Sequence, residues 1–367
     1  MSLSIRDLAT PGVRALQPYQ PGKPLGELER EYGIRDAIKL ASNENPLGPS
    51  PLGLAAARQA LGEVELYPDS HGFALKQALA TALAVDPGQL VLGNGSNEIL
   101  QLVARAFLNP GDEVVVAQYA FAIFTTVAVS AGGSVVTVPA RDWGADLPAM
   151  RAAVTDRTRV IFLANPNNPT GTWHRAAPLR AFLESLPQHV VVVLDEAYCE
   201  YVSEPDYPNG LAWLAQFPNL LVSRTFSKIY GLAGLRLGYG VASAPMADLL
   251  NRLREPFTVN NLALAAGEAA LADHEHVRRA RDANAQGLVA LVAACERLGL
   301  ACIPSVGNFI AVDVGRPAGP VYEALLRRGV IVRPLAPYGM PNHLRITIGT
   351  PAQMDRLLAA LPQALAG

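Results

Sequence analysis

The chain has little net charge, few cysteines and no long apolar run, and each of these features excludes a class of protein. The formal net charge of -2 gives no reason to expect nucleic acid or an anionic membrane as a partner. The three cysteines, Cys199, Cys295 and Cys302, are too few and too scattered for a disulfide framework or a zinc site, and they fit a reducing compartment. No apolar run approaches the roughly 18 residues of a membrane span, and the start of the chain lacks the pattern of a secretory signal. We therefore expect a cytoplasmic protein that binds no metal.

The length and apolar content are those of a globular protein. With 367 residues, of which 50% are apolar and 17% charged, the chain can build a sizeable core and two or three domains of roughly 150 residues each. Prolines break any regular element in residues 1–40, so we expect an N-terminal arm there that packs with the small domain or a partner subunit.

The middle of the chain has the alternating pattern of an α/β domain. Between residues 41 and 255, short β-branched runs that are apolar on both faces alternate with segments of helical apolar spacing. Such runs are typical of parallel strands covered by helices. Seven strands are expected, at 90–92, 113–116, 134–138, 160–163, 190–194, 220–222 and 237–241. We predict a large domain around a mostly parallel seven-stranded sheet.

The residue composition and the apolar pattern change after Pro256. Residues 261–298 are alanine-rich and helical, and they are followed by strand-like runs at 309–314, 330–333 and 344–348 with helices near 319–328 and from 351. This mixture predicts a smaller α+β domain over residues 256–367.

A single lysine among hydroxyl residues is the first candidate for chemistry. Lys228 follows the apolar run at 220–222 and lies between Thr225, Ser227 and Arg236. It is either a loop lysine at the surface, the usual place for lysine, or a lysine that forms a Schiff base with an aldehyde. This stretch alone leaves both interpretations open.

A glycine-containing turn at 92–98 joins a predicted strand to a predicted helix. Ser96 and Asn97 are placed to cap that helix and to donate hydrogen bonds to a phosphate; an ordinary strand–turn–helix junction is the alternative. Glu98 stands where a dinucleotide motif has its third glycine, and a P-loop lysine is missing. The pattern therefore favours a phosphate monoester over a nucleotide.

Two further motifs lie at the carboxyl ends of predicted strands, where open α/β sheets bind ligands. The doubled Asn-Pro at 165–169 makes a rigid loop that holds Asn168, although a plain turn is the alternative. Asp195 ends an apolar strand, and a buried carboxylate needs a partner; a protonated pyridine nitrogen would serve, while helix capping or Mg²⁺ binding are the alternatives. Tyr198, three residues on, could reach a phenolate oxygen of the same ring.

Together, phosphate donors, an acid for a ring nitrogen, a phenol, an asparagine and a lysine describe pyridoxal 5'-phosphate. Asp195 would keep the ring nitrogen protonated, so that the ring accepts the electrons of a carbanion. Tyr198 and Asn168 would donate to the ring oxygen. Thr225, Ser227 and Arg236 would bind the phosphate and its neighbouring hydroxyls.

With these motifs, the sequence resembles the fold-type I pyridoxal-phosphate aminotransferases, and within them the histidinol-phosphate aminotransferase family. The wider resemblance rests on Asn168-Pro-Thr-Gly171, Asp195-Glu-Ala-Tyr198, and Thr225-Phe-Ser-Lys228 with Arg236. The narrower one rests on Pro18-Tyr19-Gln20, Ser42-Asn-Glu-Asn-Pro46, Tyr67-Pro68-Asp69, and Val330-Ile-Val-Arg333 followed by Arg345.

The resemblance implies a homodimer and further site residues. Tyr67 would come from the other subunit to the cofactor phosphate, and Phe121 would stack on the ring, with Tyr119 as a rival. In the substrate site, Tyr19 would line the pocket and Arg345 would bind the charged end of the substrate. Arg333 would bind a phosphate or a second carboxylate, unless it closes a salt bridge.

The implied reaction belongs to histidine biosynthesis and has two half-reactions. L-Histidinol phosphate gives its amino group to the cofactor through Lys228, and 2-oxoglutarate then collects it, which yields imidazole acetol phosphate and L-glutamate. Small molecules are the only substrates expected. Three alternatives remain open: an aromatic amino acid aminotransferase acting on phenylalanine or tyrosine, a threonine-phosphate decarboxylase, and a non-catalytic cofactor-binding module.

Overall fold

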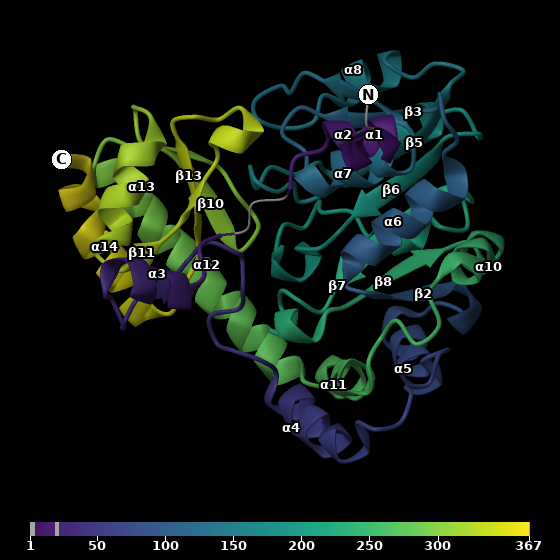
Figure 1. Ribbon diagram of the computed structural model, residues 1–367, viewed down its shortest axis with the longest axis horizontal. Coiled ribbons are helices and arrows are strands. Elements are labelled where there is room, and N and C mark those ends of the chain that lie inside the picture. Colours follow the sequence, from purple (N-terminus) through teal and green to yellow (C-terminus); the bar gives the residue numbers. More distant parts are fainter. Residues whose placement is uncertain (1–3, 19–21, 367) are drawn as a thin grey trace.

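The computed structural model describes residues 4–18 and 22–366, and its larger part is built on a seven-stranded sheet (Figure 1). The strand order is β2-β8-β7-β6-β5-β3-β4. All neighbours are parallel except β8, which runs antiparallel to β2 and to β7. The strands are β2 (Leu90–Asn94), β3 (Glu113–Ala117), β4 (Ser134–Val138), β5 (Thr158–Ala164), β6 (Val191–Asp195), β7 (Leu220–Thr225) and β8 (Leu237–Ala242). The predicted mostly parallel, seven-stranded sheet is confirmed.

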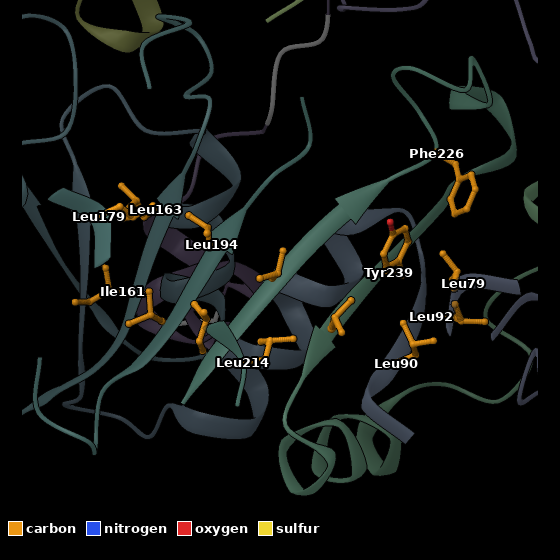
Figure 2. Close-up of a cluster of buried hydrophobic side chains, with 14 of the residues drawn as sticks. Leu79, Leu90, Leu92, Ile161, Leu163, Leu179, Leu194, Leu214, Phe226 and Tyr239 are labelled. Atoms are coloured by element: carbon orange, nitrogen blue, oxygen red, sulfur yellow. The ribbon is translucent and has the colours of Figure 1, made fainter. Parts of the chain in front are cut away.

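Helices cover both faces of this sheet, because its strands are apolar on both sides. Within β3, Val115 packs into one core, whereas Val114 and Val116 pack into the other, as the two-residue period of a strand requires. The first core lies under α5 (Phe73–Leu83), α8 (Leu147–Ala152), α9 (Ala176–Ser185) and α11 (Asn261–Leu271), and Figure 2 shows part of it. The second lies under α6 (Ser96–Phe107), α7 (Ala122–Ser130) and α10 (Ala244–Leu253).

The smaller part is an antiparallel sheet of order β12-β13-β10-β9 with helices packed on it. Its strands are β9 (Ala301–Ile303), β10 (Phe309–Asp313), β12 (Arg333–Pro334) and β13 (His343–Thr347). The helices are α12 (His274–Arg297), α13 (Ala318–Leu326) and α14 (Pro351–Ala366).

One predicted strand is wrong in its extent. The run expected at 330–333 divides between two sheets: β11 (Val330–Ile331) pairs in parallel with β1 (Ile38–Lys39), and β12 pairs with β13. Each half therefore finds a different neighbour, which the apolar pattern of a continuous run does not reveal.

The predicted division at 1–40, 41–255 and 256–367 stays a prediction, and the packing suggests how to refine it. Helix α11 packs on α4 (Pro51–Ala60) and α5 of the larger part, while α12 runs on to the small sheet (Figure 1). Asp273, which caps α12, also accepts a hydrogen bond from Ser50 at 2.6 Å. We propose a boundary near residue 273, where α12 begins.

The N-terminal arm contacts both parts of the molecule. Helix α2 (Pro11–Ala15), which follows α1 (Ile5–Leu8), packs beside α7 of the larger part. Leu28 of α3 (Leu25–Tyr32) is buried against Leu326 and Ile331 of the smaller part. Over the described ranges 4–18 and 22–366, the helices are all too short or too polar to cross a membrane.

Candidate functional site

A cavity of about 290 Å³ lies where the carboxyl ends of β5, β6 and β7 face the smaller part. Parallel strands end at the same edge of a sheet, so motifs far apart in the sequence meet there. Its walls also include the start of α6, residues 41–44, and side chains of β12 and β13. The predicted site residues that line it are Ser96, Asn97, Phe121, Asn168, Asp195, Tyr198, Thr225, Ser227, Lys228, Arg236, Arg333 and Arg345.

One predicted residue lies elsewhere. Tyr67 is 82% exposed and stacks on Phe257, with 4.7 Å between the ring centroids. It was expected to reach a cofactor from a second subunit, and in its own chain it lies on the surface. Tyr19 lies outside the described residues.

Lys228 lines the cavity and lies three residues after Thr225, the last residue of β7. Its Nζ donates a hydrogen bond to the carbonyl of Ser42 at 3.1 Å and lies 5.6 Å from the centre of the Tyr198 ring. Burial, assisted by the nearby Arg345 charge, lowers the pKa of Lys228 to about 8. A substantial fraction of the amine is therefore neutral near physiological pH, as a nucleophile or base requires.

Asp195 is a buried carboxylate at the end of β6. It accepts hydrogen bonds from the Ser223 hydroxyl at 3.1 Å and from the amide of Ala197 at 3.2 Å. Burial nevertheless raises the pKa of Asp195 to about 6. The carboxylate does not cap a helix, because the next element is a short 3₁₀ turn whose N-cap is Tyr198. A cationic ring nitrogen in the cavity would stabilise its ionised form.

Tyr198 is held by a residue to which the sequence analysis assigned no role. Burial raises the pKa of Tyr198 to about 12, and the side-chain amide of Asn43 donates to its hydroxyl at 2.9 Å. Asn43 is buried and has a left-handed backbone, with φ of 55°, which asparagine tolerates better than most residues. In the sequence, Asn43 is marked only by its place in the polar segment 42–46, one of the segments on which the family resemblance rests.

The start of α6 and Arg236 form a cradle for an anion. The predicted capping is wrong: the N-cap of α6 is Gly95, and neither Ser96 nor Asn97 makes a side-chain cap because both lie in the first turn. Glycine is needed at 95, where φ is 81° and an added Cβ would lie 2.5 Å from Arg236 Nη2. The free amides of a helix start and a guanidinium together favour a phosphate.

The hydroxyl residues after β7 belong to the same cradle. The hydroxyl of Ser227 accepts from Arg236 Nη1 at 3.4 Å, and the Ser227 amide donates to the hydroxyl of Thr225 at 3.1 Å. The cavity thus combines an anion cradle, a carboxylate, a phenol and an amine. These are the groups that pyridoxal 5'-phosphate needs for its phosphate, ring nitrogen, ring oxygen and aldehyde, so the residues present fit this cofactor.

The two arginines of the smaller part face each other across neighbouring strands. Arg333 of β12 pairs with Arg345 of β13, and both are buried. Arg345 donates to the side-chain oxygen of Asn168 and, at 2.7 Å, to the carbonyl of Ala41. Like charges opposite each other on paired strands are unfavourable, so this position suits an anionic ligand that both guanidinium groups can bind.

The contact with Arg345 also orients Asn168. Because its carboxamide oxygen accepts from Arg345, the amide nitrogen is turned the other way, where it can serve as a donor.

Between the two aromatic candidates, the geometry favours Phe121. Phe121 lines the cavity and packs edge-on against Phe124, with ring centroids 5.9 Å apart. Tyr119 is not among the residues that line the cavity. Its ring packs against Trp143, with 5.4 Å between the ring centroids, and its carbonyl accepts from Asn167 at 2.9 Å. A ring-stacking role would therefore belong to Phe121.

Comparisons with known proteins agree on one family. The model of the class I and II aminotransferases matches residues 35–361. The chain is 57% identical to histidinol-phosphate aminotransferase 2 of Pseudomonas fluorescens strain Pf0-1, over 100% of both chains. It is also 57% identical to the protein of the same name from Pseudomonas aeruginosa, over 98% of each. Among solved structures, histidinol-phosphate aminotransferase from Sinorhizobium meliloti in complex with pyridoxal-5'-phosphate has a TM-score of 0.90 and 34% identity, covering 98% of this chain and 97% of that one.

Proposed function

The chain belongs to the class I and II aminotransferase family, and we propose that it transfers the amino group of L-histidinol phosphate to 2-oxoglutarate. The enzyme is an aminotransferase whose cofactor is pyridoxal 5'-phosphate. The proposed products are imidazole acetol phosphate and L-glutamate, which places the reaction in histidine biosynthesis, as the names of the relatives suggest.

The observation that supports this choice of substrates is the facing pair Arg333 and Arg345. A ping-pong reaction uses one site for both substrates, so the site must accept a phosphate monoester in one half-reaction and a dicarboxylate in the other. Guanidinium groups bind both anions in a bidentate manner. Two of them, buried at one end of the cavity, suit the doubly charged end of the donor and the second carboxylate of the acceptor.

The other cavity residues would hold the cofactor and move a proton. When bound, pyridoxal 5'-phosphate supplies an electron sink for the carbanion at the substrate's alpha carbon. The start of α6 and Arg236 would hold its phosphate, and Asp195 its ring nitrogen. Lys228 Nζ would take the proton from the alpha carbon, since a base works best when its pKa is near the working pH.

We also propose that the enzyme is a homodimer. Large apolar side chains lie exposed on α4, on the turn that follows it, and at the start of α5, close to Phe257; they are Leu52, Leu61, Val64, Leu66, Tyr67 and Phe73. Exposed apolar groups gathered on neighbouring elements are typical of an interface. A second copy of the chain would cover them and could bring Tyr67 to the phosphate cradle. The cytoplasmic location stays a prediction.

The test is to follow the cofactor's visible absorbance while one amino donor at a time is added without any oxo acid. We expect L-histidinol phosphate to convert the cofactor to its amine form about tenfold faster or more than L-phenylalanine does, because only the phosphate engages both arginines. Comparable rates would assign the enzyme to the aromatic class. Release of carbon dioxide from O-phospho-threonine would make it a decarboxylase.

A further inference from the structure

Asn43 lies in the wall of the cavity and joins the two parts of the molecule. It is only 1% exposed, and its side chain contacts Tyr198 of the larger part. Its backbone amide donates to the hydroxyl of Thr347 at 2.9 Å, and its carbonyl accepts from the side chain of Asn308 at 3.0 Å. Thr347 and Asn308 both belong to the smaller part.

Thr347 determines which way the amide of Asn43 points. A hydroxyl carries one hydrogen, and the Thr347 oxygen already accepts from the Asn43 backbone. Its hydrogen is directed at the Asn43 side-chain oxygen, 3.0 Å away. This places the amide oxygen toward Thr347, so the amide nitrogen is the atom that faces Tyr198 at 2.9 Å.

The orientation of this amide decides where the hydrogen of Tyr198 goes. An amide nitrogen only donates, so the Tyr198 oxygen acts as the acceptor in this contact. The hydroxyl hydrogen of Tyr198 must then point to another acceptor. Tyr198 lines the cavity, so the cavity is the direction that remains.

We propose that Asn43, oriented by Thr347, is a positioning residue that keeps the hydroxyl hydrogen of Tyr198 directed into the cavity. This inference rests on the proposed function, in which the cofactor's ring oxygen is the acceptor there. A donor at that oxygen stabilises its anionic form and lowers the proton affinity of the cofactor's linkage to Lys228. Thr347 lies two residues after Arg345 on β13. The strand that orients Asn43 therefore also carries an anion-binding side chain.

Other charges surround Tyr198, and the choice of variants must leave them unchanged. They are Arg345 on β13, Asp195 on β6 and Lys228 after β7, and the titratable phenol of Tyr338 lies near them. Thr347→Val keeps the shape and charge of the site and removes only the hydroxyl, which frees the Asn43 amide to turn its oxygen toward Tyr198. Thr347→Ser retains the hydroxyl and is the matched control. Asn43→Asp, made both in the parent and in Tyr198→Phe, is a second variant, because a carboxylate accepts the Tyr198 hydrogen directly, and any shift caused by its added charge alone persists in Tyr198→Phe.

The measurement is the pH at which the visible absorbance of the bound cofactor changes, in the cofactor-loaded enzyme without substrate. Tyr198→Phe should raise this pH by about one unit or more, the effect of losing a hydrogen bond to a charged group. Thr347→Val and Asn43→Asp should raise it in the same direction, whereas Thr347→Ser should match the parent. The double variant Tyr198→Phe/Thr347→Val should match Tyr198→Phe alone.

Two outcomes separate this proposal from the one on which it rests. If Tyr198→Phe raises the transition but Thr347→Val and Asn43→Asp leave it unchanged, Asn43 does not orient Tyr198 and the proposal is overturned. If Tyr198→Phe itself has no effect, the ring oxygen does not lie at Tyr198, and the proposed cofactor contact is withdrawn as well. Equal shifts in Thr347→Val and Thr347→Ser would also overturn the proposal, because the hydroxyl would then be irrelevant.

Discussion

Among the individual residues, Asp195 shows how a binding site can oppose stability. Its carboxyl group is 5% exposed, and burial raises its pKa from the ordinary value of 3.8 to about 6. Without a cationic partner, keeping this carboxyl group ionised in the folded protein at neutral pH therefore costs free energy. In the absence of the cofactor, a carboxylate placed to pair with a protonated ring nitrogen therefore lowers the stability of the folded protein.

This cost predicts how the stability of the cofactor-free protein depends on pH. Because the folded pKa exceeds the unfolded one, the contribution of Asp195 is fully present below pH 3.8 and is lost as pH rises through about 6. At pH 7, cofactor-free Asp195→Asn should therefore be more stable than the parent, by up to about 3 kcal/mol, and yet bind the cofactor more weakly. Denaturant unfolding of both proteins at pH 4 and pH 7 measures the difference. An equal difference at both pH values would contradict the assignment.

Arg333 should distinguish substrates by their charge. If it binds the phosphate together with Arg345, Arg333→Met should lower kcat/KM for L-histidinol phosphate by about ten- to a hundredfold, the range of a lost charge-assisted contact. The value for L-phenylalanine should change little. Arg327→Met, at the exposed arginine that follows the last residue of α13 and pairs with Glu323, is the matched control. Equal losses on both substrates would indicate a structural arginine.

The close packing of β8 against the start of α6 shapes the phosphate cradle. Gly238 of β8 pairs with Gly93 of β2, and a Cβ added at 238 would lie 2.2 Å from the backbone nitrogen of Ser96. A rigid backbone atom cannot move aside as a flexible side chain would. Glycine at 238 therefore lets the helix start approach the sheet.

Gly238→Ala should accordingly damage both stability and cofactor binding. Overpacking of this kind costs about 1–3 kcal/mol, and the displaced amides of α6 should weaken the affinity for pyridoxal 5'-phosphate. Denaturant unfolding and a cofactor titration measure the two effects. Gly319→Ala on α13, where an added Cβ meets nothing within 4 Å, should lower neither, because alanine is the better helix former. A Gly238→Ala protein with parental cofactor affinity would show that the cradle tolerates a shift of α6.

In the molecule as a whole, the site depends on how the two sheets are placed. Asp195 and Lys228 belong to the seven-stranded sheet and its loops, whereas Arg333 and Arg345 belong to the smaller sheet. The segment at 41–44 runs between them and contacts both. Neither part alone contains the amine and the anion-binding side chains.

The proposed dimer makes a prediction about subunits that carry different defects. If Tyr67 acts on the partner's site, a mixture of Lys228→Ala and Tyr67→Ala subunits contains mixed dimers with one intact site. With random pairing, the activity should recover to about a quarter of the parental value. A mixture of Lys228→Ala with Asp195→Asn is the control, since both residues line the cavity of the same chain, and it should stay inactive. No recovery in the first mixture would place Tyr67 outside the partner's site.

The sequence alone determined much of this protein because the decisive signals are local. Apolar runs with a two-residue or a helical period indicate strands and helices, and each motif at 92–98, 164–171, 195–198 and 225–236 lies within a few residues of its strand. Strands that end at one edge of a sheet bring such motifs together. The cofactor and the seven strands of the large sheet were therefore predictable.

Only the tertiary structure decided the contacts between distant segments. Asn43 and Thr347 lie 304 residues apart in the chain, and no local pattern relates them. Tertiary pairing likewise set the antiparallel direction of β8, the division of 330–333 between two sheets, and the opposition of Arg333 and Arg345. The chain's periodicity specifies which residues form strands and which face is buried, but the neighbour of each strand is chosen by packing of the whole chain.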